Sequence, residues 1–442
     1  MVTRSIERMR VGAIGPLKGE LALPGDKSIT HRAIILGSLA DGVSEITGAL
    51  RSHDCRDTAK AFRAMGVAIE ALDDGWLRIH GVGLSGLKEP ADALDLGNSG
   101  TTMRLLAGLL AAQPFFSVLT GDQYLRARPM ARVVMPLRSM GATILGRAGG
   151  NLPPLAIRGT RLQAIDYVSP VASAQVKSAI LLAGLFADGE TTVTEPSLSR
   201  DHTERMFEAI GIPIRRDGLR VHVDGIKKIS PFQMAIPGDF SAAAFFLVAA
   251  LVLPGSELTL RDVGMNPTRT GLLDALRSMG AVIEISRQRI VSGEPVADLH
   301  VRSHALHGTE IGGALIPRMV DEIPVFAVAA ALAAGVTTIR DAGELRVKEV
   351  DRIAAIVKEL RGFGVQIEQR PDGLIIQGGA SLSGCHCDSW GDHRMAMALA
   401  VAALAAEGST TISDPFCVSS SFPDFWTRLA TIAPGAATSL EV

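Results

Sequence analysis

Hydrophobic and polar positions along the chain follow one order that recurs six times. A polar start opens a helix rich in Ala and Leu; a Gly and a β-branched strand follow, then a polar turn and an amphipathic helix. The stretches with this order are 26–67, 98–143, 173–212, 239–282, 321–365 and 392–414, the last continued by the helix "PDFWTRLATIA". Such a unit cannot bury its apolar helix alone, so the pattern predicts a protein built from stacked repeats.

The hexapeptide "LRSMGA" occurs twice, at 137–142 and at 276–281. In both places it ends the second helix of a repeat, where a Gly in the left-handed conformation closes the helix. A strand is predicted directly after each copy, as "ATILG" and "AVIEI". The hexapeptide therefore marks equivalent points in the second and fourth repeats.

The six repeats fall into two sets of three. Pro-Gly-Asp occurs at 24–26 and at 237–239, where repeats one and four open, and we infer that the chain crosses between two domains there. A chain of 442 residues exceeds the usual size of a single core, which favours two domains. An N-terminal strand at about 11–23 is expected to join the second domain. The predicted domains are 24–237, and 1–23 combined with 238–442.

Composition and charge exclude some classes of protein function. The chain is 47% hydrophobic but only 4% aromatic, so Ala, Leu, Val and Ile carry the core. The longest apolar runs are shorter than the roughly 20 residues that a membrane-spanning helix needs. The start shows no apolar signal region and the four Cys form no disulfide framework, which predicts a cytoplasmic protein. A net charge of −2 offers no basic field for nucleic acid.

Basic residues recur at the predicted helix starts. A helix N-terminus carries about half a positive charge and unpaired N–H groups, so a cation there is unfavourable unless an anion is present. Helix starts that converge on one cleft would form a trap for phosphates and carboxylates. The alternative is that each cation only pairs with a nearby acid. The cations concerned are Lys27, Arg32, Arg104, Lys177 and Arg394 at first helices, and Arg128, Arg200, Lys348 and Arg352 near second helices.

Several longer motifs match one enzyme family. The stretches "LPGDKSITHRA", "LGNSGTTMRLL", "RARPM", "ELRVKEVDRI", "GDHRMAMALA" and "SFPDF" resemble the 5-enolpyruvylshikimate-3-phosphate (EPSP) synthases, the 3-phosphoshikimate 1-carboxyvinyltransferases. The resemblance runs from residue 23 to residue 425. It implies an α/β (α+β) fold, a two-domain inside-out α/β barrel of six βαβαββ repeats, three per domain. "RDHTE", and Ser420 where some relatives carry Lys, place the chain nearer the class II branch.

The resemblance also implies a reaction. The 5-hydroxyl of shikimate 3-phosphate attacks C2 of phosphoenolpyruvate while C3 is protonated, and the tetrahedral intermediate then loses phosphate. The step belongs to chorismate and aromatic amino acid biosynthesis. No metal or organic cofactor, no nucleic acid and no membrane is expected to take part, and a monomer is expected. Gly100 suggests sensitivity to the phosphoenolpyruvate analogue glyphosate.

Site residues carry over from the family at matching positions. Lys27 would bridge both substrates and take part in catalysis with Asp321, the candidate base, and Glu349, the candidate acid for C3. A helix start favours the ionised form of Asp321, and a shielded Glu349 suits proton donation. The expected shikimate 3-phosphate ligands are Lys27, Ser28, Arg32, Ser173, Ala174, Gln175, Arg200, Asp321 and Lys348. The expected phosphoenolpyruvate ligands are Lys27, Asn98, Gly100, Thr101, Arg128, Gln175, Arg352 and Arg394.

Three alternatives compete with this interpretation. UDP-N-acetylglucosamine enolpyruvyl transferase shares the fold, but it uses an Asn after the first Lys and a loop Cys; here Ser28 follows Lys27 and the second repeat has no Cys. A zinc protein would use "CHC" at 385–387 with His393, or the group His300, His304 and His307, but a second ligand pair is missing and a plain strand edge is expected. A scaffold would not require the acids beside the arginines.

Overall fold

The computed structural model describes residues 7–72 and 75–440. Residues 1–6, 73–74 and 441–442, which fall within the two predicted domains, lie outside the described part. The chain divides into two compact units. Unit 1 comprises Met1–Pro24, Gly238–Arg289 and Pro295–Val442, and unit 2 comprises Gly25–Pro237 and Ile290–Glu294.

Unit 2 holds three four-stranded sheets and the helices of the first three repeats. Its strands are β3 (Asp41–Thr47), β4 (Ala68–Ala71), β5 (Leu77–Val82), β6 (Leu94–Asp95), β7 (Phe116–Thr120), β8 (Thr143–Gly146), β9 (Leu152–Arg158), β10 (Asp166–Val168), β11 (Glu190–Thr194), β12 (Ile214–Asp217), β13 (Arg220–Asp224) and β14 (Gln233–Ala235). Its helices are α1 (Lys27–Leu39), α2 (His53–Ala64), α3 (Gly100–Leu110), η2 (Leu125–Ala127), α4 (Ala131–Ser139), α5 (Arg147–Gly150), α6 (Ala174–Gly184) and α7 (His202–Ala209).

Unit 1 repeats this arrangement with three further sheets. Its strands are β1 (Arg8–Gly12), β2 (Lys18–Ala22), β15 (Glu257–Gly264), β16 (Ile283–Val291), β17 (Glu294–Arg302), β18 (Glu310–Ile311), β19 (Val336–Ile339), β20 (Gln366–Arg370), β21 (Gly373–Gln377), β22 (His386–Asp388), β23 (Ser409–Ser413) and β24 (Ala437–Leu440). Its helices are α8 (Phe240–Val252), α9 (Gly271–Ser278), η3 (Gly313–Leu315), α10 (Ile316–Met319), α11 (Ile323–Leu332), η4 (Gly343–Val347), α12 (Arg352–Gly362), α13 (His393–Leu404), η5 (Pro415–Ser420) and α14 (Phe425–Ile432). The turn between β16 and β17 belongs to unit 2.

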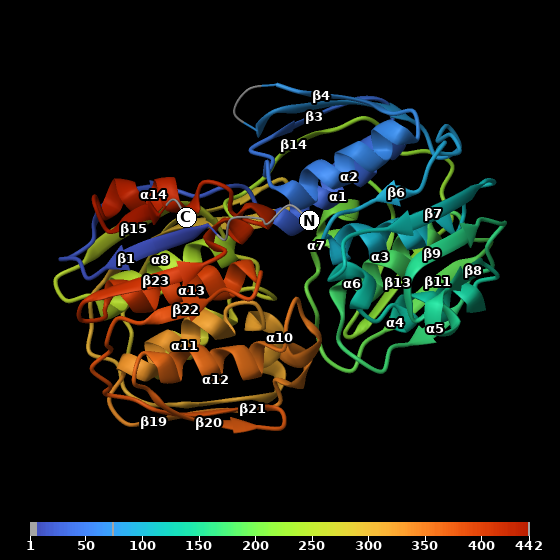
Figure 1. Ribbon diagram of the computed structural model, residues 1–442. Coiled ribbons are helices and arrows are strands. Elements are labelled where there is room, and N and C mark those ends of the chain that lie inside the picture. Colours follow the sequence, from blue (N-terminus) through green and yellow to red (C-terminus); the bar gives the residue numbers. More distant parts are fainter. Residues whose placement is uncertain (1–6, 73–74, 441–442) are drawn as a thin grey trace. The chain divides into compact units, whose positions relative to one another are not determined.

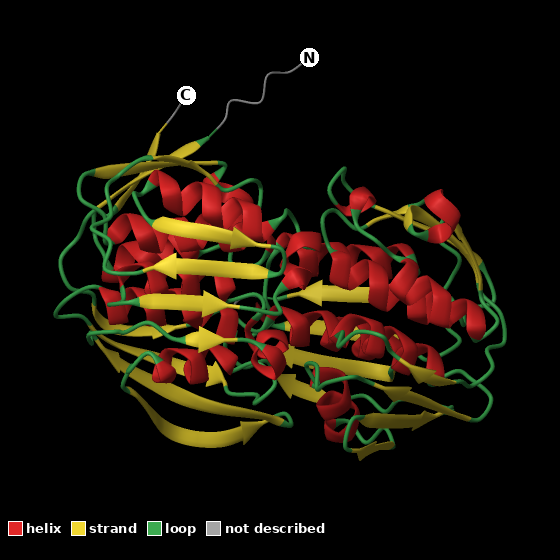
Figure 2. Ribbon diagram, turned by 90° about the horizontal axis from the view of Figure 1, so that it is seen from below, coloured by secondary structure: helices red, strands yellow, loops and turns green. Residues whose placement is uncertain are grey.

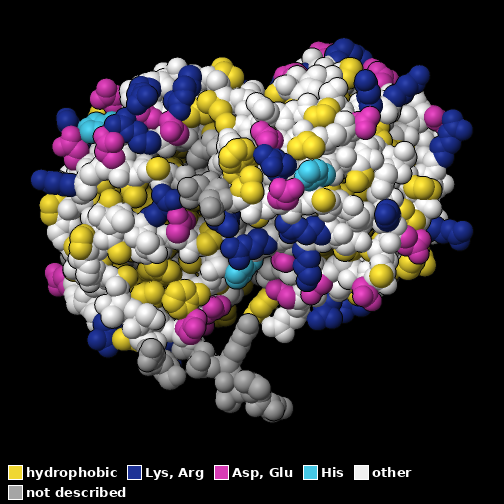
Figure 3. All heavy atoms as spheres, turned by 90° about the horizontal axis from the view of Figure 1, so that it is seen from above, with side chains coloured by type: hydrophobic (Ala, Val, Ile, Leu, Met, Phe, Trp, Pro, Cys, Tyr) yellow, Lys and Arg dark blue, Asp and Glu magenta, His cyan; other side chains and the backbone are white. Residues whose placement is uncertain are grey.

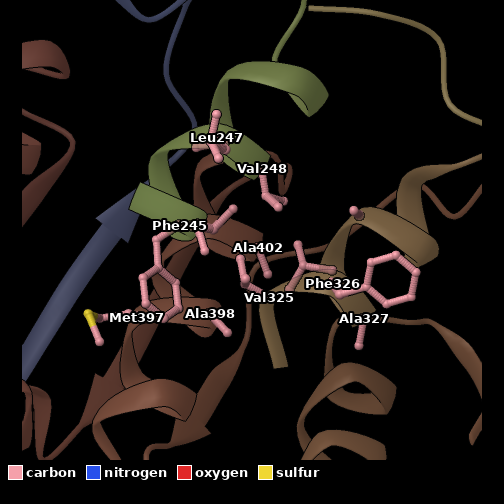
Figure 4. Packing of buried hydrophobic residues seen from close by; sticks show 14 of the residues in the cluster. Phe245, Leu247, Val248, Val325, Phe326, Ala327, Met397, Ala398 and Ala402 are labelled. Carbon is pink, nitrogen blue, oxygen red and sulfur yellow. The ribbon is translucent and has the colours of Figure 1, made fainter. Parts of the chain in front are cut away.

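The first helix of each repeat lies at the centre of its unit, with sheets on the outside (Figures 1 and 2). In unit 1, α8, α11 and α13 are buried over nearly their whole length. Their side chains interdigitate, among them Phe245, Val325 and Met397 (Figure 4). A helix that is apolar all round is stable only when neighbours cover every face. The helices rich in Ala and Leu that the sequence predicts therefore form the core of each unit.

All six sheets share one strand arrangement. In the second repeat the order is β6-β7-β9-β8, with β6 parallel to β7 and the other two pairs antiparallel. The first strand of the repeat thus lies at one edge and its third strand at the other. The βαβαββ unit implied by the resemblance has this connectivity.

The two Pro-Gly-Asp segments exchange strands between the first and fourth repeats. β2 precedes α1 in the chain but lies parallel to β15 of the fourth repeat. β14 precedes α8 but lies parallel to β3 of the first repeat. The strand that precedes the first helix of repeat one therefore lies in the sheet of repeat four, and the strand that precedes the first helix of repeat four lies in the sheet of repeat one.

The prediction of a single N-terminal strand at about 11–23 is wrong. Two strands form instead, and they join different sheets: β1 lies between β23 and β24, and β2 pairs with β15. The segment between them contains Gly15 and Pro16, and proline cannot donate to a strand ladder. β1 takes the place that the fourth strand of a repeat has elsewhere, which completes the sixth sheet.

Both copies of "LRSMGA" close a helix as predicted. α4 ends at Ser139 and α9 at Ser278. Gly141 has a φ of 102° and Gly280 a φ of 91°, values at which a side chain would be strained. β8 and β16 follow directly. Among the helices of the described residues, none is both long enough and apolar enough to cross a membrane.

Candidate active site

The start of α1 places two predicted site residues in unit 2. Asp26 caps the helix by accepting a hydrogen bond from the backbone N–H of Ile29 at 2.9 Å. Lys27 begins the helix, and its Nζ lies 2.5 Å from Oδ2 of Asp54 at the start of α2. Because Asp54 holds it, the Lys27 ammonium is fixed at a helix start, where the helix dipole alone would repel it.

Arg32 lies one turn further into α1 and is buried. Its guanidinium donates to Oγ1 of Thr203 at 2.6 Å, to Oγ of Ser178 at 2.7 Å and to the carbonyl of Ser28 at 2.9 Å. Burial lowers the pKa of Arg32 to about 10, although the nearby Glu204 opposes this shift. These three acceptors are neutral oxygens, and a buried cation held in this way is suited to an anionic ligand.

Lys177 was grouped with the anion-binding cations, and this prediction is wrong. Its Nζ lies 2.6 Å from Oε2 of Glu195 and 2.7 Å from Oε1 of Glu204, with all three side chains almost fully buried. Burial alone would lower the pKa of Lys177, but Glu204 and Glu195 outweigh it and the pKa is raised. For this residue the alternative of local pairing holds. The cluster of Lys177, Glu195 and Glu204 is called the buried triad below.

The start of α3 gathers a second group of predicted site residues in unit 2. Gln175 of α6 links two of them, since its Nε2 donates to Oγ1 of Thr101 at 2.9 Å and its Oε1 accepts from Arg104 at 2.5 Å. Asn98 donates to Oδ2 of Asp122 at 2.9 Å. The starts of α3 and α6 are thus joined through polar side chains. Arg104 belongs to this group, although the sequence assigned it to neither substrate.

Gly100 lets two guanidinium groups approach the first turn of α3. A Cβ at this position would lie 2.7 Å from a guanidinium nitrogen of Arg128 and 3.1 Å from one of Arg104. The first distance is too short for a carbon–nitrogen contact and the second is tight, so a side chain here would shift the guanidinium of Arg128. The glycine therefore leaves the space that the Arg128 guanidinium occupies.

Replacing Gly100 with Ala should raise the KM for phosphoenolpyruvate about tenfold and leave the KM for shikimate 3-phosphate within twofold, because the methyl group displaces Arg128. Steady-state kinetics with each substrate varied in turn measures this. Gly15→Ala is the matched control, since a Cβ there meets no atom within 4 Å. Equal rises in both KM values for Gly100→Ala would contradict the assignment of Arg128.

In unit 1, Arg352 joins three acids. It begins α12, is almost fully buried, and lies 2.7 Å from Asp392, 2.7 Å from Glu349 and 3.2 Å from Asp321. Burial alone would lower the pKa of Arg352, but Asp392, Glu349 and Asp321 raise it well above its ordinary range. The candidate base and the candidate acid therefore share one guanidinium. Asp321 lies two residues before α11 begins.

Lys348 precedes Glu349 and lies 3.6 Å from Oε1 of Glu344. Burial lowers the pKa of Lys348; Asp321 and Glu344 oppose this shift and Arg352 adds to it. The ammonium gives up its proton more readily than an exposed lysine does. Asp321, which pairs with Arg352, thus also acts on the charge of Lys348.

The start of α13 carries Arg394, the last predicted cation. Asp392 caps the helix by accepting from the backbone N–H of Arg394 at 2.8 Å while it also holds Arg352. Nδ1 of His393 lies 3.0 Å from Oγ of Ser420. Ser420, at the position where some relatives carry Lys, thus contacts His393, which directly precedes Arg394.

The start of α7 carries Arg200 in the loop before the helix. Asp201 occupies the N-cap position of α7, but its side chain makes no capping hydrogen bond. Asp201 instead pairs with Arg205 at 2.9 Å and with Arg216 at 3.2 Å. At α6, Ser173 does cap its helix and Ala174 is the first helical residue.

The segment 385–387 is a sheet edge, as predicted: β22 is the outer strand of its sheet. Within 7–72 and 75–440, no three His, Cys, Asp or Glu side chains are grouped as a metal site requires. Figure 3 shows basic and acidic side chains interspersed over the visible face. This mixture agrees with the near-zero net charge.

Sequence reasoning missed the residues that hold the site residues in place. They are Asp54 for Lys27, Thr203 and Ser178 for Arg32, and Asp392 for Arg352. A weak signal existed only for Asp392, which opens the predicted helix of the sixth repeat. The others lie on second helices or inside apolar helices, where nothing in the local sequence singles them out.

Comparison with known proteins identifies the class. The fold of a crystal structure titled as the enolpyruvyl transferase NikO from Streptomyces tendae superposes with a TM-score of 0.80 over 99% of this chain and 100% of that one, at 17% identity. A structure of EPSP synthase from Acinetobacter baumannii superposes with a TM-score of 0.87 at 42% identity, over 98% and 100% of the two chains. The molecule therefore has the two-domain α/β enolpyruvyl transferase fold, which confirms the predicted fold class.

The family follows from sequence similarity. The model of the family "EPSP synthase (3-phosphoshikimate 1-carboxyvinyltransferase)" matches residues 11–429. Proteins of that enzyme name from Desulforamulus reducens and Geobacter sulfurreducens are 55% and 58% identical over 94% of this chain and 97% of theirs. The chain belongs to the EPSP synthase family. The predicted enzyme, a 3-phosphoshikimate 1-carboxyvinyltransferase of the shikimate pathway, is confirmed, and the sugar-nucleotide alternative is not favoured.

Proposed function

We propose that the cations and acids described above carry out the family's reaction on shikimate 3-phosphate and phosphoenolpyruvate. The observation that carries the assignment is the arrangement around Arg352, which contacts both Asp321 and Glu349 through one guanidinium. A scheme that removes one proton and adds another needs two acids close together.

Binding of shikimate 3-phosphate uses the starts of α1, α6 and α7. Arg32 receives the carboxylate, because its guanidinium is buried and donates to the neutral oxygens of Thr203, Ser178 and Ser28. The backbone N–H groups and hydroxyl at the α6 start, with Arg200, receive the phosphate. The full set is Lys27, Ser28, Arg32, Ser173, Ala174, Gln175, Arg200, Asp321 and Lys348.

Binding of phosphoenolpyruvate uses the start of α3 and the cations of unit 1. Gly100 leaves the first turn of α3 open, and Arg128 lies directly over it. An anion there meets both a guanidinium and a helix N-terminus. The full set is Lys27, Asn98, Gly100, Thr101, Arg128, Gln175, Arg352 and Arg394.

The catalytic residues are Lys27, Asp321 and Glu349. Asp321 takes the proton of the 5-hydroxyl as its oxygen bonds to C2 of phosphoenolpyruvate, and Glu349 gives a proton to C3. The Glu349 carboxylate then takes a proton back from C3 as the bond between C2 and the phosphate oxygen breaks, which releases phosphate and the enolpyruvyl ether. Lys27 offsets the charge of the phosphoenolpyruvate and of the reacting oxygen.

Phosphate release from phosphoenolpyruvate in chelator-treated buffer tests the proposal. Release with shikimate 3-phosphate as acceptor, and none with UDP-N-acetylglucosamine, is the expected result. Release with the sugar nucleotide alone would overturn the acceptor while leaving the fold unaffected. Activity lost with the chelator and restored by a metal ion would overturn the metal-free scheme.

The remaining assignments also stay proposals. Domains of 24–237, and of 1–23 with 238–442, are supported by the division into two compact units. A monomeric enzyme in the cytoplasm is also proposed, and the family's role in biosynthesis supports the location. Sedimentation of the purified chain at about its own mass would agree with a monomer.

A further inference from the structure

The turn between β16 and β17 is bound to α7 within unit 2. Nδ1 of His202 lies 2.7 Å from Oε1 of Glu294, although the two residues are 92 positions apart. Each side chain is only 2% exposed. Among the described residues, Nε2 of His202 is buried and has no hydrogen-bond partner, so the imidazole is held from one side, through Nδ1.

Three further contacts fix this turn. Arg205 of α7 donates to the carbonyl of Gly293 at 3.4 Å. The backbone N–H of Ala235 in β14 donates to Oγ of Ser292 at 3.0 Å. A Cβ on Gly293 would lie 3.1 Å from Cβ of Ala209, so the turn packs closely against the helix. Residues 290–294 accordingly belong to unit 2, although most of both strands belongs to unit 1.

The same end of α7 holds the proposed ligands of shikimate 3-phosphate. Its first three residues each bind a different partner: His202 binds Glu294, Thr203 accepts from Arg32 at 2.6 Å, and Glu204 pairs with Lys177 at 2.7 Å. Arg200 lies two residues before the helix. Any shift of α7 would therefore move Arg200 and the hydroxyl that orients Arg32.

We propose that Glu294 is a positioning residue for shikimate 3-phosphate: through His202 it fixes the start of α7, and so sets Arg200 and Arg32 for the phosphate and the carboxylate. The inference rests on the proposed function of these two arginines. Glu294 does not contact substrate itself. A ligand group held a fraction of an ångström out of place loses much of its affinity, which is why such supporting contacts matter.

Glu294→Ala should raise the KM for shikimate 3-phosphate roughly tenfold, with kcat and the KM for phosphoenolpyruvate within twofold. Glu294→Gln keeps an oxygen that accepts from His202 and should recover most of the affinity. A purely structural role would change both KM values together. Glu208→Ala is the matched control, since this exposed carboxylate lies on the same helix and pairs with Arg216.

A second variant keeps the test decisive if Glu294→Ala does not fold. Ser292→Ala removes only the contact to Ala235 and leaves no buried charge; a rise in the KM for shikimate 3-phosphate alone supports the proposal. Unchanged or equally changed KM values in the variants that fold overturn it. Arg200→Met and Arg32→Met test the underlying assignment separately: if neither raises the KM for shikimate 3-phosphate, the proposed binding site fails, whatever Glu294 does.

Discussion

Replacing Asp321 with Asn should lower kcat by about 100- to 10,000-fold while both KM values stay within a few-fold, because the amide cannot take the proton of the attacking hydroxyl. The side chain is about one-fifth exposed and contacts Arg352 at 3.2 Å. Asn keeps an oxygen that accepts from this guanidinium, so the cluster around Arg352 stays assembled. Rapid-quench single turnovers measure the chemical step directly.

Glu368→Gln is the matched control for this variant. Glu368 is an exposed carboxylate of the same unit that pairs with Arg370, and its replacement should leave kcat unchanged. Thermal unfolding checks that Asp321→Asn is folded. A kcat within threefold of the parent enzyme would exclude Asp321 as the base and leave Lys27 as the candidate.

Lys177→Met should lower the free energy of unfolding by about 3–5 kcal/mol, because it leaves Glu195 and Glu204 buried without their cation. Both carboxylates are almost inaccessible to water. For a unit of this size the loss corresponds to a fall in Tm of roughly 10 °C. Calorimetry of the full chain measures the transition, and Lys227→Met, at an exposed position of unit 2, is the control.

A triple variant distinguishes this cause from a loss of packing. Lys177→Met combined with Glu195→Leu and Glu204→Leu replaces the whole buried triad by apolar groups, and such a replacement is often neutral or stabilising. Its Tm should return to within a few degrees of the parent value. A triple variant as unstable as Lys177→Met would show that the charges are not the reason for the loss.

The repeats and their helix starts were predictable because they depend on local sequence. A polar cap before an apolar run and a Gly after an amphipathic helix are short-range signals, and Asp26, Ser99 and Gly141 occupy these positions in the structure. The motifs around Lys27 and Arg352 were long enough to indicate the family. The proposed site residues therefore lie at or near helix starts, as the local pattern predicts.

Long-range pairing could not be predicted in the same way. Lys177 has the same local pattern as the other cations, and only the folded chain shows that Glu195 and Glu204 neutralise it. The contact of Glu294 with His202 joins a turn and a helix that share no local signal. The exchange of β2 and β14 between sheets is also decided by tertiary pairing, since both strands are short and precede identical tripeptides.

The place of β1 has a consequence for synthesis on the ribosome. β1 is made before every other strand that the structure describes, whereas its two neighbours, β23 and β24, are the last of them to be made. Unit 2 can close once residue 294 has emerged, whereas the sixth sheet must wait for residues 437–440. Domains generally fold in the order in which they are made. In the nascent chain, β1 therefore stays without its strand partners until β23 and β24 have been made.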